Sequence, residues 1–389
     1  MICVIPERLN AHNPRSDVYT CEMLIRLTKF LSGTVIILSF ILLAVFAVRW
    51  LLFNGVAEAT VLPDKPVVDM HVHIAGLGYG NSGCFISDDL KKGYKFNYYL
   101  NAFGVTTEEM AVAGDQIVVQ RVAEGIRDSV RVSAAIILAM DGVIDINGKL
   151  DKARTQVYIP NDFVAEQTAK YSELFFGASI NPYRKDALER LEKVKRQGAK
   201  LIKWIPNIQH IDPADRKIIP FYQKMKALGL PLLSHAGQER SFGSANDAYG
   251  DPARLDLPLS LGVIVIAAHM ATTGETDDEM NDQRLLPLLD TYPNLYSEIS
   301  SLTQLNKLGY LDKALKQPKA KGRLLYGSDY PLTNMVLVSP WYFPLTLSLQ
   351  QMWEISHINN PWDRDVALKQ ALGVPAEVFA RSAELFGIQ

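Results

Sequence analysis

The stretch PVVDMHVHI, residues 66–74, decides the fold class. A near-continuous run of apolar, valine-rich residues of this length predicts a strand buried on both faces, which is typical of a parallel sheet. Seven further stretches have the same character: VRVSAAIILAM (130–140), LFFGASI (174–180), AKLIKWI (199–205), PLLSH (231–235), VIVIAAH (263–269), NLYSEI (294–299) and RLLY (323–326). The sequence therefore predicts an α/β protein with eight parallel strands.

Helical or long connecting segments separate the predicted strands. Helices are expected at 107–130, 162–170, 185–197, 213–228, 251–261, 278–291 and 306–316, with two or three more after residue 340. Eight alternating units favour a closed (β/α)8 TIM barrel over an open doubly wound sheet. The glycine-rich dinucleotide turn is also missing after the first strand, which weakens the open-sheet alternative. We expect the barrel and its C-terminal helices to occupy 64–389, with an insertion at 82–104 that could cover the mouth.

A second feature precedes the barrel. Residues 34–53 form an apolar run with one charge, Arg49, and a helix of this length crosses a hydrocarbon layer of ~30 Å. Arg26 and Lys29 precede the run. This basic bias predicts a cytoplasmic N-terminus and an extracytoplasmic barrel. The expected organisation is a short polar tail (1–33), a transmembrane anchor (34–53), a linker (54–63) and the barrel.

Ala57-Glu58-Ala59 offers an alternative to the anchor, because it resembles a small-residue signal-peptide cleavage site. Cleavage after Ala59 would release a secreted protein. However, the apolar run is longer than the usual ~7–15 residues of a signal peptide, and Arg49 interrupts it near the site. We therefore favour an uncleaved membrane anchor with a periplasmic or otherwise extracytoplasmic barrel.

Charge and cysteine content exclude several classes of protein. The 389 residues contain 40 Lys+Arg and 42 Asp+Glu, a formal charge of -2, which gives no support for an electrostatic nucleic-acid binder. Cys3, Cys21 and Cys84 are too few and too scattered for a disulfide framework or a thiolate metal site. The expected partners are a small-molecule substrate and the membrane, with a homo-oligomer left open.

Polar residues gather at the predicted carboxyl ends of the strands, where a parallel barrel builds its active site. In the first strand, His71 and His73 are two residues apart, so both imidazoles should point into the barrel, with Asp69 beneath them. The other strands contribute Lys203, His235, His269 and Asp329. Each residue alone has an ordinary explanation as a hydrogen-bonded core residue, a helix cap or a surface lysine. Their convergence on one face favours a metal site.

Neutral imidazoles and a carboxylate form the ligand set that Zn²⁺ and similar ions prefer. Such an ion lowers the pKa of a water molecule to ~7, and a carboxylate that touches both ion and water can take the proton. The sequence therefore predicts a catalytic centre with a divalent ion, zinc first and manganese or cobalt as alternatives.

The strand-end motifs also resemble a known family. They are VVDMHVH (67–73), IKWIP (202–206), LLSHAG (232–237), IAAHM (266–270) and LLYGSDYP (324–331), and the ending VFARSAELFGI (378–388) is similar to the family's last helix. Together they resemble the amidohydrolase superfamily, specifically the amidohydrolase-related family of metal-dependent hydrolases, over roughly 64–389. One departure is Arg381-Ser382, where a Gly-Asn pair is commoner.

The resemblance implies a role for each residue. His71 and His73 bind the buried metal, and His235 is a further ligand or binds a second ion. His269 ligates the second ion in two-metal members, and in one-metal members it contacts substrate or acts in catalysis. Asp329 ligates the metal and serves as general base. Lys203 would bridge two ions if carbamylated, and otherwise would bind substrate or pack.

The implied reaction is hydrolysis of an ester, lactone, amide or similar bond in a small molecule. One alternative is non-oxidative decarboxylation of an aromatic or muconate-type acid, because relatives use the same residues as lyases. A third hypothesis is a non-catalytic, membrane-tethered binding barrel. Arg240, shortly after His235, is a candidate contact for a substrate carboxylate.

Overall fold

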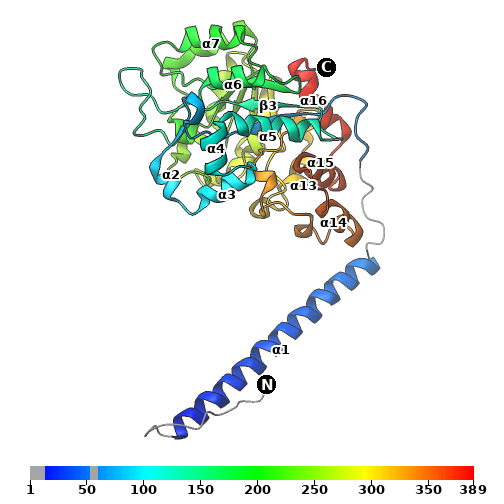
Figure 1. The fold of residues 1–389 in the computed structure, drawn as a ribbon. Coiled ribbons are helices and arrows are strands. Elements are labelled where there is room, and N and C mark those ends of the chain that lie inside the picture. The colour runs from blue at the N-terminus through cyan, green and yellow to red at the C-terminus, as the bar shows by residue number, and fades with distance from the viewer. Residues whose placement is uncertain (1–13, 53–59) are drawn as a thin grey trace. The chain divides into compact units, whose positions relative to one another are not determined.

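The computed structural model describes residues 14–52 and 60–389 and divides the chain into two compact units, Met1–Val56 and Ala57–Gln389 (Figure 1). The second unit is called the catalytic unit below. Residues 1–13 of the expected tail, most of the expected linker and the Ala57-Glu58-Ala59 site lie outside the described residues.

The first unit contains one helix, α1 (Pro14–Leu52). The expected anchor therefore lies in a longer helix, and residues 14–33 of the expected polar tail are helical as well. Its segment Met23–Val48 has a mean hydropathy of 2.7 and is not buried, so by length and composition it is able to cross a membrane; a signal sequence would pass the same test. Thr34 and Ser39 donate hydrogen bonds to the carbonyls four residues earlier, at 2.9 and 2.8 Å, which satisfies these hydroxyls within the helix.

The catalytic unit is built on eight parallel strands. They are β1 (Val68–His73), β3 (Ala134–Leu138), β5 (Leu174–Gly177), β6 (Ile202–Trp204), β7 (Leu232–Ser234), β8 (Val265–Ala267), β11 (Leu295–Glu298) and β12 (Leu324–Leu325). They pair as β1-β3-β5 and as β6-β7-β8-β11-β12. Parallel bridges from Ala178 to Ile202 and from Val72 to Tyr330 join the two groups. The sheet therefore closes on itself, and each strand lies within one of the eight predicted stretches.

Helices cover the outside of this barrel (Figure 1). They are α4 (Thr107–Ala113), α5 (Gln116–Arg127), α6 (Asn161–Thr168), α7 (Ala187–Arg196), α8 (Pro206–Gln209), α9 (Ile219–Leu228), α10 (Asp256–Ser260), α11 (Asn281–Arg284), α12 (Leu286–Thr291) and α13 (Tyr310–Leu315), followed by α14 (Leu349–Ser356), α15 (Pro361–Ala371) and α16 (Ala376–Phe386).

Two helix predictions need correction. The helix expected at 107–130 is split in two, because Gly114 has a φ of 84° that no α-helix accommodates. The helix expected at 278–291 begins only at Asn281, because β9 (Glu275–Thr276) and β10 (Glu279–Met280) first form an antiparallel hairpin.

A β-bulge in β1 sets which side chains enter the barrel. Val68 pairs with Ala134 and His73 with Leu138, and the register shifts between Asp69 and Val72. Ala134 and Leu138 are four residues apart on a regular strand, so their side chains lie on the same face of the sheet. Their partners Val68 and His73 therefore both point into the barrel, although they are five residues apart. Below the histidines, the interior is filled by a buried cluster that includes Met70, Ile136, Leu233, Ile266, Leu325 and, from α16, Phe386. His71 and His73 therefore lie next to a closely packed apolar core.

The insertion after β1 lies beside the mouth. Its strand β2 (Phe85–Ile86) pairs with β4 (Val157–Tyr158), and it continues into α2 (Asp88–Lys92) and α3 (Lys95–Ala102). Leu100 and Phe103 are buried in the core, which fixes this segment to the barrel. In Figure 1, α2 and α3 run along the lower edge of the catalytic unit.

Candidate metal centre

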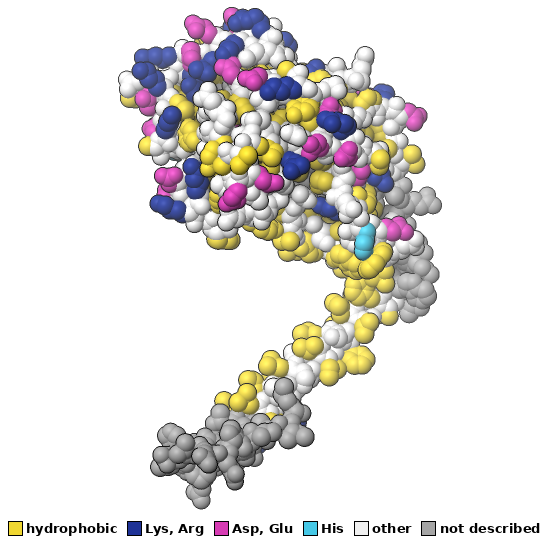
Figure 2. All heavy atoms as spheres, viewed as in Figure 1, with side chains coloured by type: hydrophobic (Ala, Val, Ile, Leu, Met, Phe, Trp, Pro, Cys, Tyr) yellow, Lys and Arg dark blue, Asp and Glu magenta, His cyan; other side chains and the backbone are white. Residues whose placement is uncertain are grey.

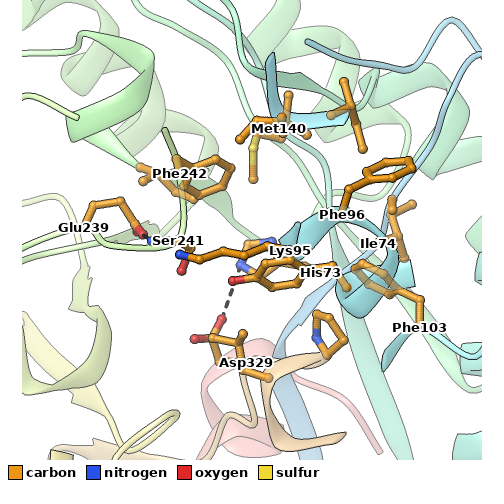
Figure 3. A pocket seen from close by; sticks show the side chains of 18 of the residues that line it. His73, Ile74, Lys95, Phe96, Phe103, Met140, Glu239, Ser241, Phe242 and Asp329 are labelled. Atoms are coloured by element: carbon orange, nitrogen blue, oxygen red, sulfur yellow. Dashed lines mark hydrogen bonds and ion pairs between the residues drawn. The ribbon is translucent and has the colours of Figure 1, made fainter. Parts of the chain in front are cut away.

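The polar residues predicted from the strand ends meet in space. His71 and His73 lie on β1, and Lys203 lies on β6. His235, His269 and Asp329 lie one, two and four residues after the ends of β7, β8 and β12. All except His73 are buried, and His73 is partly buried. In Figure 3, His73 and Asp329 face each other at the base of a cavity. The carboxyl ends of distant strands are thus brought to one point by closure of the sheet.

Three donor atoms have the separations of ligands that share one ion. His71 Nε2 lies 3.1 Å from His73 Nε2, and Asp329 Oδ1 lies 3.5 Å from each of these nitrogens. Two ligands bound to a tetrahedral Zn²⁺ at ~2.1 Å would be ~3.4 Å apart. The three atoms therefore fit a divalent ion without rearrangement of the backbone.

His269 completes the arrangement from the other side of Asp329. Its Nε2 lies 3.9 Å from Asp329 Oδ2, and donor atoms of His71, His269 and Asp329 all lie within 4.8 Å of one another. Asp329 thus directs one oxygen to the pair on β1 and the other towards His269. This geometry matches a carboxylate that both binds an ion and handles a proton.

His235 lies at the edge of this group. Its ring centroid is 5.4 Å from that of His269, and its Nδ1 is 3.7 Å from Glu239 Oε2. Its Nε2 is buried and has no hydrogen-bond partner among the described residues. An unpaired buried nitrogen is costly unless a ligand satisfies it, so His235 suits a further metal ligand.

Glu298, at the end of β11, contacts two of the site histidines, and the sequence interpretation missed it. Its Oε1 lies 3.1 Å from His71 Nδ1 and accepts a hydrogen bond of 3.0 Å from the backbone of His269. The Ser300 hydroxyl lies 2.7 Å from His269 Nδ1. These contacts to Nδ1 leave Nε2 of both imidazoles free for an ion. The signal was present in NLYSEI, where an acidic residue ends an otherwise buried strand.

The protonation states also suit metal binding. Burial lowers the pKa of His73 to about 4 and that of His235 to about 3, and it holds the pKa of His71 and His269 well below the ordinary value. Burial alone would raise the pKa of Asp329. Its interactions with His71 and His73 and a hydrogen bond from Ser301 instead bring this pKa below its ordinary value. Near neutral pH the site therefore offers neutral imidazoles and an ionised carboxylate.

Lys203 lies within reach of the same position. Its Nζ is 3.1 Å from His71 Nε2, and burial lowers its pKa to about 8. An ammonium group repels a cation at such a distance, so this lysine would become a ligand only after deprotonation or modification. The placement accommodates the predicted carbamate, which itself stays a prediction.

Arg240 and Asp69 lie elsewhere than expected. The side chain of Arg240 is 66% exposed and pairs with Asp247 at 3.7 Å, and Arg240 is not among the described residues that line the cavity. Asp69 does not lie beneath the imidazoles, because the β-bulge turns it to the outside of the barrel. There it accepts hydrogen bonds from the indole of Trp362 (2.9 Å) and the backbone of His71 (3.1 Å), so it fixes the position of β1 from the outer side of the barrel.

A cavity of about 370 Å³ opens above the metal site. Its walls are mostly aliphatic and aromatic, and they include Ile74, Phe96, Tyr99, Phe103, Met140 and Phe242. Figure 3 shows Lys95, from α3, extending across the cavity towards Glu239 and Ser241. Glu239 is buried, and burial raises the pKa of its carboxyl. The cavity therefore suits a molecule with an apolar body and a polar group directed at the ion.

Several solved structures are similar to the chain at low sequence identity. Solved structures similar to the chain include an uncharacterised TIM-barrel protein from Bordetella bronchiseptica (15% identity, 79% of this chain and 99% of that chain, TM-score 0.48). Others are 5-carboxyvanillate decarboxylase from Sphingomonas paucimobilis (12%, 84% and 100%, 0.46) and dihydroorotase from Campylobacter jejuni (14%, 86% and 87%, 0.38). At such scores their reactions are not transferred to this chain. No curated protein matches it.

A protein-family model described as Amidohydrolase matches residues 68–337, from the first residue of β1 to beyond the last strand. The match includes every metal-site residue named above and covers most of the chain. The chain therefore belongs to the amidohydrolase family.

Proposed function

We propose that the protein is a metal-dependent hydrolase that cleaves an ester, lactone, amide or similar bond in a small molecule with an apolar body. The observation that carries the proposal is the triangle of His71 Nε2, His73 Nε2 and Asp329 Oδ1, with sides of 3.1, 3.5 and 3.5 Å, at the base of an apolar cavity. Two nitrogens and a carboxylate oxygen favour Zn²⁺, with Mn²⁺ or Co²⁺ as alternatives.

A bound divalent ion would supply Lewis-acid polarisation of the substrate and a lowered pKa of water. Asp329 is ionised and faces both the ligand pair and the cavity, so it accepts the proton of the attacking water and returns it to the leaving group. His269 contacts Ser300 at Nδ1 and directs Nε2 towards Asp329; with its proton on Nε2 it would donate to the reacting group and steady developing negative charge there. The apolar walls exclude bulk water and hold the substrate body.

Asp329→Asn tests the proposal in the zinc-loaded protein with a panel of aryl esters, lactones and amides. Asparagine keeps the size of the side chain and tolerates the φ of 62° at this position. We expect kcat to fall by roughly 10²–10⁴-fold, because the proton acceptor is lost. Asp290→Asn, at an exposed carboxylate, is the control. Full activity of Asp329→Asn on a substrate that the parent protein hydrolyses would refute the mechanism.

Decarboxylation is the second candidate, and two lysines favour it. Lys203 lies on the inner wall at the metal site, and Lys307, partly buried, interacts with the carboxylates of Asp329, Glu239 and Glu298. Lys203 lines the cavity and offers a counter-charge for a substrate carboxylate beside the ion, and Lys307 adds positive charge near Asp329. Aromatic and muconate-type acids should then release CO2 without incorporation of oxygen from water, whereas a hydrolase incorporates it. A purified protein that contains no metal and takes up none on titration would instead favour the non-catalytic binding barrel.

We also propose that α1 anchors the catalytic unit to a membrane, with the N-terminus in the cytoplasm. The support is the apolar segment Met23–Val48 and the basic bias on its N-terminal side, where Arg26 and Lys29 lie. The catalytic unit would then act outside the cytoplasm.

A further inference from the structure

The mouth of the barrel has an exposed apolar surface that the chemistry of the site does not use. Its residues follow the carboxyl ends of β11 and β12 and are Leu305, Val336, Trp341, Leu345, Leu349 and Trp353, all exposed. We call them the apolar rim. Val336 is 70%, Leu345 67% and Trp353 60% exposed, so large apolar side chains face water across the whole segment.

The rim is continuous and adjoins the cavity. The Leu305 amide donates a hydrogen bond of 2.9 Å to the Leu337 carbonyl, and the Val336 amide donates one of 3.1 Å to the hydroxyl of Tyr98 on α3. The short helix of Pro340–Tyr342, which holds Trp341, packs against α14, which holds Leu349 and Trp353. Upstream in the same segment, Pro331 and Leu332 line the cavity. One surface therefore runs from the cavity wall outward.

Composition and surface charge distinguish the rim from ordinary exposed apolar residues. The segment 331–353 contains no Asp, Glu, Lys or Arg. By contrast, Ile146 of the catalytic unit is an exposed apolar side chain whose chain neighbours, Asp145 and Asn147, are polar. Figure 2 shows hydrophobic side chains gathered along the lower edge of the catalytic unit, in the region where Figure 1 labels α14. An apolar surface built from a segment without charged residues, as 331–353 is, is typical of an interaction site.

We propose that the apolar rim inserts into the surface of a lipid bilayer, so that the cavity receives its apolar substrate from the membrane. This inference rests on the proposed anchor and deepens the proposed hydrolase function. Only residues 53–59 separate the end of α1 from Thr60, which is hydrogen-bonded to Gln370 and Val374 of the catalytic unit. A connection of eight peptide steps spans at most ~28 Å, so an anchored catalytic unit stays near the bilayer.

The side chains of the rim suit a bilayer in particular. Trp341 and Trp353 are the exposed tryptophans among the described side chains, since Trp204 and Trp362 are buried. Tryptophan prefers the membrane–water interface, where its apolar body and its N–H are both accommodated. In this proposal the anchor α1 holds the catalytic unit near the membrane, and the apolar rim determines which face of the catalytic unit contacts the membrane. The apolar walls of the cavity then continue the path from the lipid to the metal site.

The contact can be measured on the full chain without any substrate. A nitroxide is attached to Leu345→Cys, or to Ile146→Cys as the control, in a Cys3→Ser/Cys21→Ser background, because Cys84 is buried. The protein is reconstituted in dioleoylphosphatidylcholine vesicles, and relaxation of the label by oxygen and by a water-soluble nickel chelate is compared. We expect oxygen to dominate at position 345 and the nickel chelate at position 146.

Two results would overturn the membrane contact. Equal access of the nickel chelate to both positions would show that the rim stays in water. A label at position 345 that is shielded from both reagents and broadened by a neighbouring label would show that the rim pairs with a second copy of the chain. Neither result depends on catalysis, so the contact is decided even if the proposed reaction fails.

Leu345→Glu tests delivery of substrate, with Ile146→Glu as the matched control. In the same vesicles, loss of one leucine side chain from the proposed bilayer contact should lower kcat/KM about tenfold for a long-chain aryl ester dissolved in the bilayer. Hydrolysis of a short-chain, water-soluble ester should stay unchanged. Equal losses on both esters would refute delivery from the membrane. No turnover of either ester by the parent protein would refute cleavage of aryl esters, and the membrane contact would then rest on the nitroxide measurement.

Discussion

At the scale of single residues, His71 is the centre of the site. Its Nδ1 meets Glu298, and its Nε2 lies within 3.5 Å of atoms of His73, Lys203 and Asp329. The imidazoles were predictable, because histidine in an apolar strand end is conspicuous. Glu298 was not predicted, because its role depends on a partner 227 positions away. A side chain that only orients a ligand has no spacing signature of its own.

Glu298→Gln should weaken metal binding by roughly 10–100-fold, because the carboxylate that fixes the His71 tautomer is lost while the shape is kept. Competition with a chromophoric zinc chelator measures the affinity directly, without a substrate. Glu189→Gln, at an exposed position of α7, serves as the control. An affinity equal to that of the parent protein would show that Glu298 does not orient the ligand.

The pH dependence of stability follows from the buried imidazoles. In the metal-free protein, burial lowers the pKa of His73 to about 4 and that of His235 to about 3, against ~6.5 in an unfolded chain. Between these values the unfolded state binds more protons than the folded state. The free energy of unfolding therefore falls as pH is lowered from ~6.5 towards 4, by up to ~1.4 kcal/mol per pH unit for each histidine.

Melting temperatures of the metal-free protein between pH 7 and pH 4 measure this effect. His73→Asn should flatten the slope, and His357→Asn, at an exposed histidine of the C-terminal region, should not. A slope that His73→Asn leaves unchanged would mean that this imidazole is not buried in its neutral form.

At the scale of elements, strand ends and irregularities place the ligands. The bulge in β1 lets Val68 fill the interior below the site while His71 and His73 still point inward. With strict alternation, Asp69 would share the inner face with His71 and His73, and Val68 would point outward. The sequence analysis assumed this alternation and therefore placed Asp69 beneath the imidazoles. At the end of β12, Gly327 leaves room for the ligand strand, since a Cβ there would lie 2.9 Å from His71 Cβ.

Gly327→Ala should therefore displace His71 and weaken metal binding, with a loss of stability of ~1–3 kcal/mol from overpacking. Zinc titration and urea unfolding measure the two effects. In Gly243→Ala, which also lies at the cavity, the nearest atom is 3.4 Å away, so this variant should bind zinc normally. Normal zinc affinity of Gly327→Ala would show that the site tolerates the added methyl group.

At the scale of the whole molecule, one closed barrel brings together residues from positions 71 to 329. The N-terminal helix is a separate unit, and its role is independent of the metal chemistry. The proposed anchor predicts that the full chain sediments with membranes and that the N-terminal segment is retained in the mature protein.

Membrane fractions washed with alkaline carbonate test this prediction. An anchored protein stays in the pellet and is released only by detergent, because a spanning apolar helix does not partition into water. Edman sequencing of the mature protein is the second readout. A mature chain that starts at Thr60 would establish cleavage after Ala59 and overturn the anchor.

The sequence by itself determined the class of fold and named most residues of the candidate site. Hydrophobic periodicity is a local property, and each of the eight strands was visible in its own stretch of chain. Histidines and an aspartate at strand ends were equally visible, as was the apolar segment before the barrel. The split of the helix expected at 107–130 and the hairpin before α11 were missed, because single backbone angles and cross-strand pairing decided them.

Only the tertiary structure decided which of these residues share a site. The separations of 3.1–3.5 Å among His71, His73 and Asp329, and the exposure of Arg240 away from the cavity, depend on the closure of the sheet and on loop paths. The same holds for Glu298 beneath the ligands and for the apolar rim around the mouth. Spacing along a chain carries no information on contacts across it, because packing of all the strands together sets those distances.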